Sequence, residues 1–173
     1  ARSLDGDHSG AAALYERYSA VLERLIRQDS KFADAYRRNL LRARRNRAVN
    51  LFLAYRAGDA TQADLRAAYA LLEGLAREVD SVGIVRWQRA GRPGLFTVSV
   101  EIAPGREGGP RRFDVAAEKR LLYTYMARIK ALTGDYAGAV RYLRRKLELY
   151  GKNPPADELV EQAVALTQIG AYE

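Results

Sequence analysis

The sequence contains no cysteine and a single histidine, His8. The absence of cysteine excludes disulfides, thiolate nucleophiles and cysteine-based metal sites. His8 lies between Gly6 and Gly10, where a lone histidine is expected to be solvated. Without His8 no Ser-His-Asp triad is available, and the sequence has no His/Glu metal cluster and no Gly-rich phosphate loop followed by Lys. We therefore expect no enzyme activity, no metal, no cofactor and no small-molecule substrate.

Long apolar runs are also missing. No window reaches the roughly 18 unbroken apolar residues that a membrane-spanning helix requires. Residues 1–10 lack the apolar centre of a secretory signal, so none is expected there. No repeat of helical-repeat length is visible along the chain. With 173 residues, 48% of them hydrophobic, the chain is expected to form one domain over residues 1–173.

What the sequence has in excess is arginine. It holds 24 arginines against 5 lysines, and 29 basic residues against 21 acidic ones give a formal net charge of +8. Residues 31–56 contain eight basic residues and one acid, Asp34, so this stretch alone carries +7. Arginine stays ionised, and its planar guanidinium matches phosphate or carboxylate. Charge this concentrated favours a role beyond solubility, because interspersed signs serve solubility better.

The basic residues of 31–56 fall on two sides of a helix with about 100° per residue. Within that helix only Asp34 could neutralise them, and close unpaired arginines repel one another unless an anion is supplied. Three interpretations stay open: binding to a nucleic-acid backbone, which we favour, binding to an acidic protein, and a solvated basic face. A sector of about 60° holds Lys31, Arg38, Arg42, Arg45 and Arg56, and another side holds Arg37, Arg44 and Arg47.

The predicted phosphate contacts would be largely blind to base sequence. No zinc-finger spacing, aromatic RNP motif or clear helix-turn-helix is present. Most of the eleven tyrosines fall within helical patterns, and Tyr123, Tyr125, Tyr136 and Tyr142 are expected to pack rather than to stack on bases. The candidate nucleic-acid-binding residues are Lys31, Arg37, Arg38, Arg42, Arg44, Arg45, Arg47 and Arg56, extended by Arg2, Arg17, Arg24 and Arg27.

The hydrophobic periodicity predicts a mainly α fold: a helix bundle with extended basic N-terminal helices and an inserted β-hairpin. In this interpretation residues 1–58 form an N-terminal arm with the basic helices, and residues 59–173 form the bundle. Between 82 and 114, β-branched and aromatic residues flank a Gly-Arg-Pro-Gly turn, which predicts the hairpin and its exit loop. Helices are predicted at about 11–28, 31–57, 61–79, 115–134, 135–151 and 154–170.

Local signals delimit these helices. Gly58 is expected to follow the second helix as its C′ residue, and Thr61 with Asp64 resembles a capping box. Asp135 is expected to cap the fifth helix. Apolar residues recur at spacings of three and four in the first helix, at Leu14, Tyr18, Val21, Leu22 and Leu25, and in the third, at Leu65, Tyr69, Leu72 and Ala76.

The last two helices have opposite charge. The basic run RYLRRK at 141–146 precedes an acidic stretch with Asp157, Glu158 and Glu161. Pairing of these charges within one molecule is slightly favoured over pairing between copies. An apolar face of the last helix is expected to make subunit contacts, and it consists of Leu159, Ala163 and Leu166 flanked by Val160 and Val164.

The segment GDYAGAVRYLRRKLELYGKNP resembles half of a tetratricopeptide unit. Gly134, Asp135, Tyr136, Ala139 and Pro154 match positions of that motif. One unit cannot stack alone, and no second copy is visible. The resemblance implies an alternative function, a helical adaptor that binds an acidic protein partner.

The region from Ala127 to the end is similar to the C-terminal region of major capsid proteins from filamentous and rod-shaped archaeal viruses (rudivirus, lipothrixvirus and tristromavirus type). The similarity rests on Tyr-Gly-x-Asn-Pro at 150–154, on the helices around it and on Tyr172. It implies a structural virion protein of a hyperthermophile virus, assembled in the cytoplasm of the archaeal host. A basic N-terminal region would embrace linear double-stranded DNA, and the C-terminal helices would form the outer wall.

The partners that this resemblance implies are double-stranded DNA and a second copy or a paralogous capsid protein, paired as dimers in a helical filament. A lipid envelope is left open. Many cationic helices around the duplex would neutralise its phosphates and exclude water, which favours A-form DNA gripped through its backbone. A chromatin-type DNA architectural protein shares the arginine chemistry without the filament.

Overall fold

The structure is a computed structural model that describes residues 6–28, 32–82, 114–151 and 154–170. Within these ranges the fold is all α, with six helices and no strand, so the six predicted helices are confirmed. The hairpin predicted at 82–114 falls on residues 83–113, outside the described residues. The helices are α1 (His8–Gln28), α2 (Ala33–Ala57), α3 (Gln62–Val82), α4 (Val115–Leu132), α5 (Tyr136–Glu148) and α6 (Ala156–Gly170).

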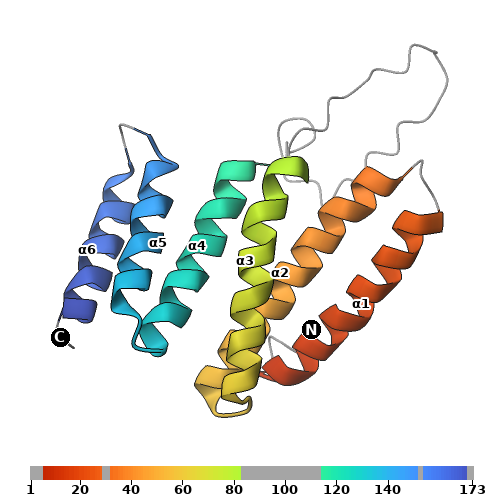
Figure 1. The fold of residues 1–173 in the computed structure, drawn as a ribbon, viewed down its shortest axis with the longest axis horizontal. Coiled ribbons are helices and arrows are strands. Elements are labelled where there is room, and N and C mark those ends of the chain that lie inside the picture. Colours follow the sequence, from red (N-terminus) through yellow and green to blue (C-terminus); the bar gives the residue numbers. More distant parts are fainter. Residues whose placement is uncertain (1–5, 29–31, 83–113, 152–153, 171–173) are drawn as a thin grey trace.

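The helices stand side by side in chain order, with α1 at one end of the array and α6 at the other (Figure 1). Each of α1 to α5 packs mainly against its neighbours in sequence, and successive helices run antiparallel. In addition α2 contacts α4, whereas α6 has the smallest attachment, mainly to α5. The described residues therefore form an all-α bundle of six helices whose contacts are mainly between successive helices.

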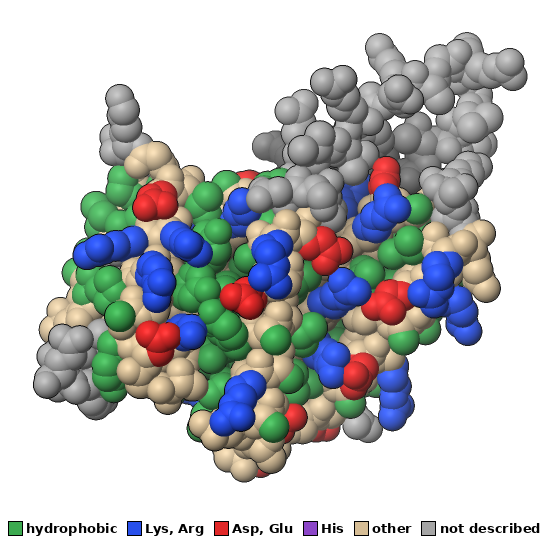
Figure 2. All heavy atoms as spheres, in the orientation of Figure 1, with side chains coloured by type: hydrophobic (Ala, Val, Ile, Leu, Met, Phe, Trp, Pro, Cys, Tyr) green, Lys and Arg blue, Asp and Glu red, His purple; other side chains and the backbone are tan. Residues whose placement is uncertain are grey.

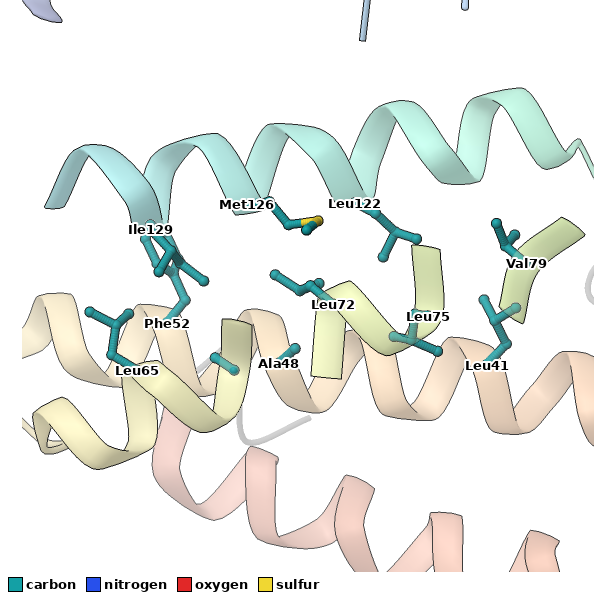
Figure 3. Packing of buried hydrophobic residues seen from close by; sticks show 11 residues of the cluster. Leu41, Ala48, Phe52, Leu65, Leu72, Leu75, Val79, Leu122, Met126 and Ile129 are labelled. Carbon is teal, nitrogen blue, oxygen red and sulfur yellow. The ribbon is translucent and has the colours of Figure 1, made fainter. Parts of the chain in front are cut away.

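The main hydrophobic core lies between α2, α3 and α4. Leu122, Met126 and Ile129 point from α4 toward the other two helices, and Leu72 of α3 lies among them (Figure 3). Burial of one such leucine stabilises the fold by about 1.5–3 kcal/mol. The cluster consists of Leu41, Ala48, Phe52, Leu65, Ala68, Leu72, Leu75, Val79, Leu122, Met126 and Ile129.

The predicted helix ends are confirmed by hydrogen bonds. Gly58 ends α2 in the left-handed conformation, with φ of 84°. The Thr61 N–H donates to Asp64 Oδ2 at 2.8 Å, and hydrogen bonds from the Thr61 hydroxyl and backbone lower the pKa of Asp64. Asp135 caps α5 by accepting from the Gly138 N–H at 2.8 Å. These caps place the helix boundaries close to the predicted positions.

The apolar pattern predicted for the first helix does not describe its packed face. Only Leu22 of that pattern is buried, whereas Leu14, Tyr18 and Val21 are 49%, 46% and 41% exposed. The face of α1 that meets α2 combines small side chains with Leu22, Tyr15 and Ile26, which pack with Leu40, Ala43 and Tyr36 of α2. Its buried residues are Ala11, Ala12, Ser19 and Leu22.

The expectation of a solvated His8 is wrong. Helix α1 begins at His8, three residues before the predicted start, and this places the imidazole against α2. His8 is half-buried, and its Nδ1 lies 3.3 Å from Oδ1 of the buried Asn50. This polar contact links the first turn of α1 to the second half of α2.

Candidate anion-binding interface

Two arginines of α2 tie together the first three helices. Arg44 donates from Nη2 to Glu23 of α1 at 3.0 Å and from Nη1 to Glu78 of α3 at 3.1 Å. Arg47 pairs with Glu16 of α1 at 2.7 Å. Both arginines belong to the predicted phosphate-binding set, and in this structure their charge is met by carboxylates of the same chain.

Two further arginines of the set are also paired. Arg45 donates to both carboxylate oxygens of Glu118 on α4 at 2.7 Å, and both side chains are largely buried. Arg37 pairs with Asp34 at 3.0 Å in an exposed contact. The repulsion inferred from the basic helix is therefore relieved mainly by acids on α1, α3 and α4, which the pattern of one helix does not reveal.

A second group of α2 arginines has no such partner. Arg38, Arg42 and Arg56 form no ion pair within the described ranges. At about 100° per residue they lie beyond Arg45, on the side of α2 that faces away from α3. They fall in the sector predicted to be cationic. Lys31 and Arg2 lie outside the described residues.

Exposed leucines of α4 adjoin this side of α2. The two helices meet at the Arg45–Glu118 pair and where Phe52 packs edge-on against Tyr125, with ring centroids 5.6 Å apart. On α4, the helical spacing places Leu121 and Leu132 on the side next to Tyr125, again away from α3. The exposed fractions of these leucines are 38% and 49%. We call this surface the α2/α4 face, formed by Arg38, Arg42, Arg56, Leu121 and Leu132.

Sequence reasoning did not select Leu121 and Leu132 as functional residues. The available signal was a second apolar side in residues 115–132, set apart from the side of Leu122, Met126 and Ile129. A helix with apolar residues on two sides needs more than one partner surface. In the described residues the core takes up only one of these sides.

Two other arginine groups lie at a distance from the α2/α4 face. Arg17, Arg24 and Arg27 are exposed on α1, while the acids of that helix, Glu16 and Glu23, are held by α2. Arg141, Arg144 and Arg145 are exposed on α5. The Arg145 guanidinium lies 5.7 Å from the ring centroid of Tyr142, close enough for a cation–π contact.

The predicted pairing of α5 with α6 is present in one contact. Lys146 of α5 and Glu158 of α6 lie 2.6 Å apart, and the Tyr150 hydroxyl donates to Glu158 at 2.6 Å. Burial and the hydrogen bond to Glu158 raise the pKa of Tyr150 to about 12. Burial would raise the pKa of Glu158, but the hydrogen bonds from Lys146 and Tyr150 bring it below its ordinary value. This network attaches the last helix.

The tyrosines expected to pack do so. The hydroxyls of Tyr69 and Tyr142 lie 2.7 Å apart, and Tyr123 stacks on Tyr142 with centroids 5.9 Å apart. Burial, followed by the hydrogen bond to Tyr69, raises the pKa of Tyr142 to about 12. Tyr125 packs against Phe52, and Tyr136 packs beside the smaller cluster of α4 and α5. Their rings are engaged in helix–helix contacts rather than available as a stacking platform.

Charges of both signs are interspersed on the face of the molecule seen in Figure 2. Acidic side chains lie among the basic ones over α1 to α3, while basic side chains are more crowded over α5 (Figure 2). This side of the molecule is therefore not uniformly cationic.

Some classes of site are missing from the described part of the chain. No cluster of three or more His, Cys, Asp or Glu residues there could hold a metal ion. None of the described helices is long and apolar enough to cross a membrane. Comparison of the chain with protein-family models, curated proteins and solved structures found no match.

Proposed function

We propose that this chain is a non-catalytic helical adaptor that binds an acidic protein segment on the α2/α4 face. The observation that carries the proposal is the presence, on one side of two adjoining helices, of exposed leucines and of arginines that have no carboxylate partner among the described residues. Arg38 and Arg42 lie one helical turn apart, the spacing at which two side chains reach the same ligand.

The mixture of residues supports a protein ligand. An amphipathic segment offers apolar side chains to Leu121 and Leu132 and carboxylates to the guanidinium groups. Charge-assisted hydrogen bonds from arginine to carboxylate are roughly twice as strong as neutral ones. A nucleic-acid backbone would satisfy the arginines and leave the leucines in water.

The architecture supports the same proposal. Helices stacked in chain order present broad open surfaces, which helical-repeat proteins use to bind extended partners. The long basic helix α2 contributes Leu41, Ala48 and Phe52 to the core, and so does not stand free as an arm. A basic N-terminal region that embraces DNA, as the capsid resemblance implies, would instead place α2 outside the core.

Binding of a labelled acidic peptide to the full chain tests the proposal. The probe is an amphipathic peptide of about 20 residues with Leu and Glu at helical spacing, and a second peptide with Gln in place of Glu is its control. The double substitution Arg38→Gln and Arg42→Gln is expected to weaken binding at least about thirtyfold, since each lost charged contact contributes about 1 kcal/mol or more.

A matched variant carries the same charge change elsewhere. Arg141→Gln with Arg144→Gln removes two exposed arginines from α5, and we expect binding of the acidic peptide to change less than about twofold. Equal weakening by both double variants would mean that net charge alone attracts the peptide. Equal binding of the Glu and Gln peptides would also contradict the proposal.

A second candidate is the coating of double-stranded DNA. Six arginines of α1 and α2 favour it because they have no ion pair within the described residues: Arg17, Arg24, Arg27, Arg38, Arg42 and Arg56. The similarity to archaeal capsid proteins adds the expectation of a virion filament around A-form DNA that the basic helices embrace. The β-hairpin at residues 82–114 stays a prediction. If six phosphates are contacted, log affinity should fall against log salt with a slope of about −5.

One titration distinguishes the two candidate functions. Binding to a mixed-sequence duplex of about 30 base pairs should show this steep salt dependence if DNA is the partner, and should be weakened by loss of arginines from either α1 or α2. If the partner is an acidic protein, substitution of Leu121 or Leu132 by Ser weakens peptide binding. The same substitutions should leave DNA binding unchanged.

A further inference from the structure

We propose that copies of this chain associate head to tail, with α6 of one copy packed on α1 of the next. The inference rests on the two ends of the helix array and is independent of the α2/α4 face. In Figure 1 these ends are the first and the last helix, separated by the core helices.

An exposed side of α1 carries an apolar stripe, formed by Leu14, Tyr18 and Val21. These residues fall at positions i, i+4 and i+7 and so lie along one side of the helix. Their exposed fractions are 49%, 46% and 41%, although α1 buries its small residues against α2. These three residues, which we call the α1 stripe, therefore remain exposed although α1 packs against α2.

The outer side of α6 carries a comparable stripe, formed by Leu159, Val160 and Val164. Their exposed fractions are 46%, 63% and 52%. Attachment of α6 to the rest of the molecule relies on Glu158 and on Ala165, which lie on another side of the helix. The α6 stripe has no partner among the described residues.

Apolar residues at both ends are unusual for a stacked array. In such proteins the terminal helices have polar outer faces, because any apolar outer face invites another unit to continue the stack. Here each end resembles an internal surface of the array. One head-to-tail contact covers the α6 end of one copy and the α1 end of the other.

The charges of the two ends are complementary. On α1 the acids Glu16 and Glu23 are held by α2, which leaves the exposed Arg17, Arg24 and Arg27. Helix α6 contains no basic residue, and its exposed Asp157 lies beside the α6 stripe at helical spacing, whereas Glu158 is already paired with Lys146. Contact of α6 with α1 brings these charges together, whereas contact of α1 with α1 or of α6 with α6 places like charges opposite each other.

Two variants with the same new charge test the pairing. Val21→Glu disrupts the α1 stripe, and Val164→Glu disrupts the α6 stripe, both at exposed positions where the fold should be retained. The masses of the full chain and of each variant are measured by sedimentation over about a hundredfold range of concentration. Ala70→Glu, at an exposed position of α3, is the matched control.

The expected pattern is specific to head-to-tail contact. The unaltered chain and Ala70→Glu increase in mass with concentration, and each stripe variant alone stays monomeric. An equimolar mixture of the two stripe variants forms a dimer, because one chain supplies an intact α6 and the other an intact α1. All variants should retain the circular dichroism of the unaltered chain.

Three results would overturn the proposal. The unaltered chain stays monomeric over the whole range, Val164→Glu alone dimerises through α1, or Val21→Glu alone dimerises through α6. Binding of the acidic peptide serves as an independent readout, since both stripe variants keep the α2/α4 face intact. Failure of self-association with retained peptide binding would reject this inference and leave the proposed function in place.

Discussion

Arg45 of α2 donates from a single guanidinium nitrogen to both carboxylate oxygens of Glu118 on α4, each at 2.7 Å. The two residues are 73 positions apart, and their side chains are 18% and 10% exposed. The pair lies at the contact between α2 and α4, beside the main core. Arg45 was expected to contact phosphate, and this geometry instead gives it a role in holding two helices together.

Breaking this pair should be costly. Replacement of Glu118 by Gln leaves a largely buried guanidinium without its counter-charge, and we expect the free energy of unfolding to fall by about 3 kcal/mol. Urea denaturation followed by circular dichroism measures the loss. The matched control is Asp34→Asn, which breaks the exposed pair with Arg37 and should change stability by less than about 1 kcal/mol.

The double variant Arg45→Met with Glu118→Leu adds a second check. It removes both charges together, so most of the lost stability should return, because replacing a buried pair by apolar side chains is often neutral. Equal destabilisation by Glu118→Gln and Asp34→Asn would show that Arg45 remains solvated in solution.

A leucine of the core and a leucine of the α2/α4 face should respond differently to truncation. Leu72→Ala leaves a cavity between α2, α3 and α4, and its expected cost is about 3 kcal/mol. Leu121→Ala changes an exposed side chain and should cost less than about 1 kcal/mol. Urea denaturation of both variants measures the difference. Comparable costs would mean that Leu121 is covered by another part of the molecule.

The helix boundaries were predictable because their signals are local. Gly58, Asp135 and the Thr61–Asp64 capping box each act within four residues, so the sequence alone contains both partners. The core side of α3 was predictable for the same reason, since Leu65 and Leu72 follow the period of one helix.

The ion pairs and the packed side of α1 were not predictable in this way. Glu23, Glu78 and Glu118 reach the α2 arginines only after three other helices have packed around α2. On α1, the apolar pattern combined the exposed Leu14 and Val21 with the buried Leu22, and it did not include the small buried residues Ala11, Ala12 and Ser19. The hydrophobic period of the sequence identifies the sides of a helix, but the close approach of neighbouring helices decides which side is buried.

Acid should loosen the attachment of α6 through Glu158. The hydrogen bonds from Lys146 and Tyr150 hold the pKa of Glu158 below its ordinary value of 4.5, despite burial. A carboxyl group with a lowered pKa contributes stability above its unfolded pKa, and this contribution is lost as the pH falls through the folded value. The stabilisation is therefore expected at neutral pH and should be lost progressively as the pH falls below 4.5.

The variant Glu158→Gln provides the measurement. The difference in unfolding free energy between the unaltered chain and the variant should be largest near neutral pH and shrink toward acid pH. Glu148→Gln, at an exposed position of α5 outside this network, should show no such trend. A difference that stays constant with pH would mean that the charge of Glu158 adds nothing to the attachment.

The paired and unpaired arginines of α2 should separate stability from binding. Arg44 bridges Glu23 and Glu78 at a partly exposed position, so Arg44→Gln should lower the free energy of unfolding by about 1 kcal/mol. The same substitution should change affinity for the acidic peptide less than about twofold, because the guanidinium is already occupied. Arg42→Gln should do the opposite, with stability within about 0.5 kcal/mol of the unaltered chain and binding weakened several-fold. Urea denaturation and fluorescence anisotropy measure the two quantities on the same samples. If Arg44→Gln weakened binding as much as Arg42→Gln, the ion pairs of α2 would have to open for the ligand, and the division between structural and binding arginines would be wrong.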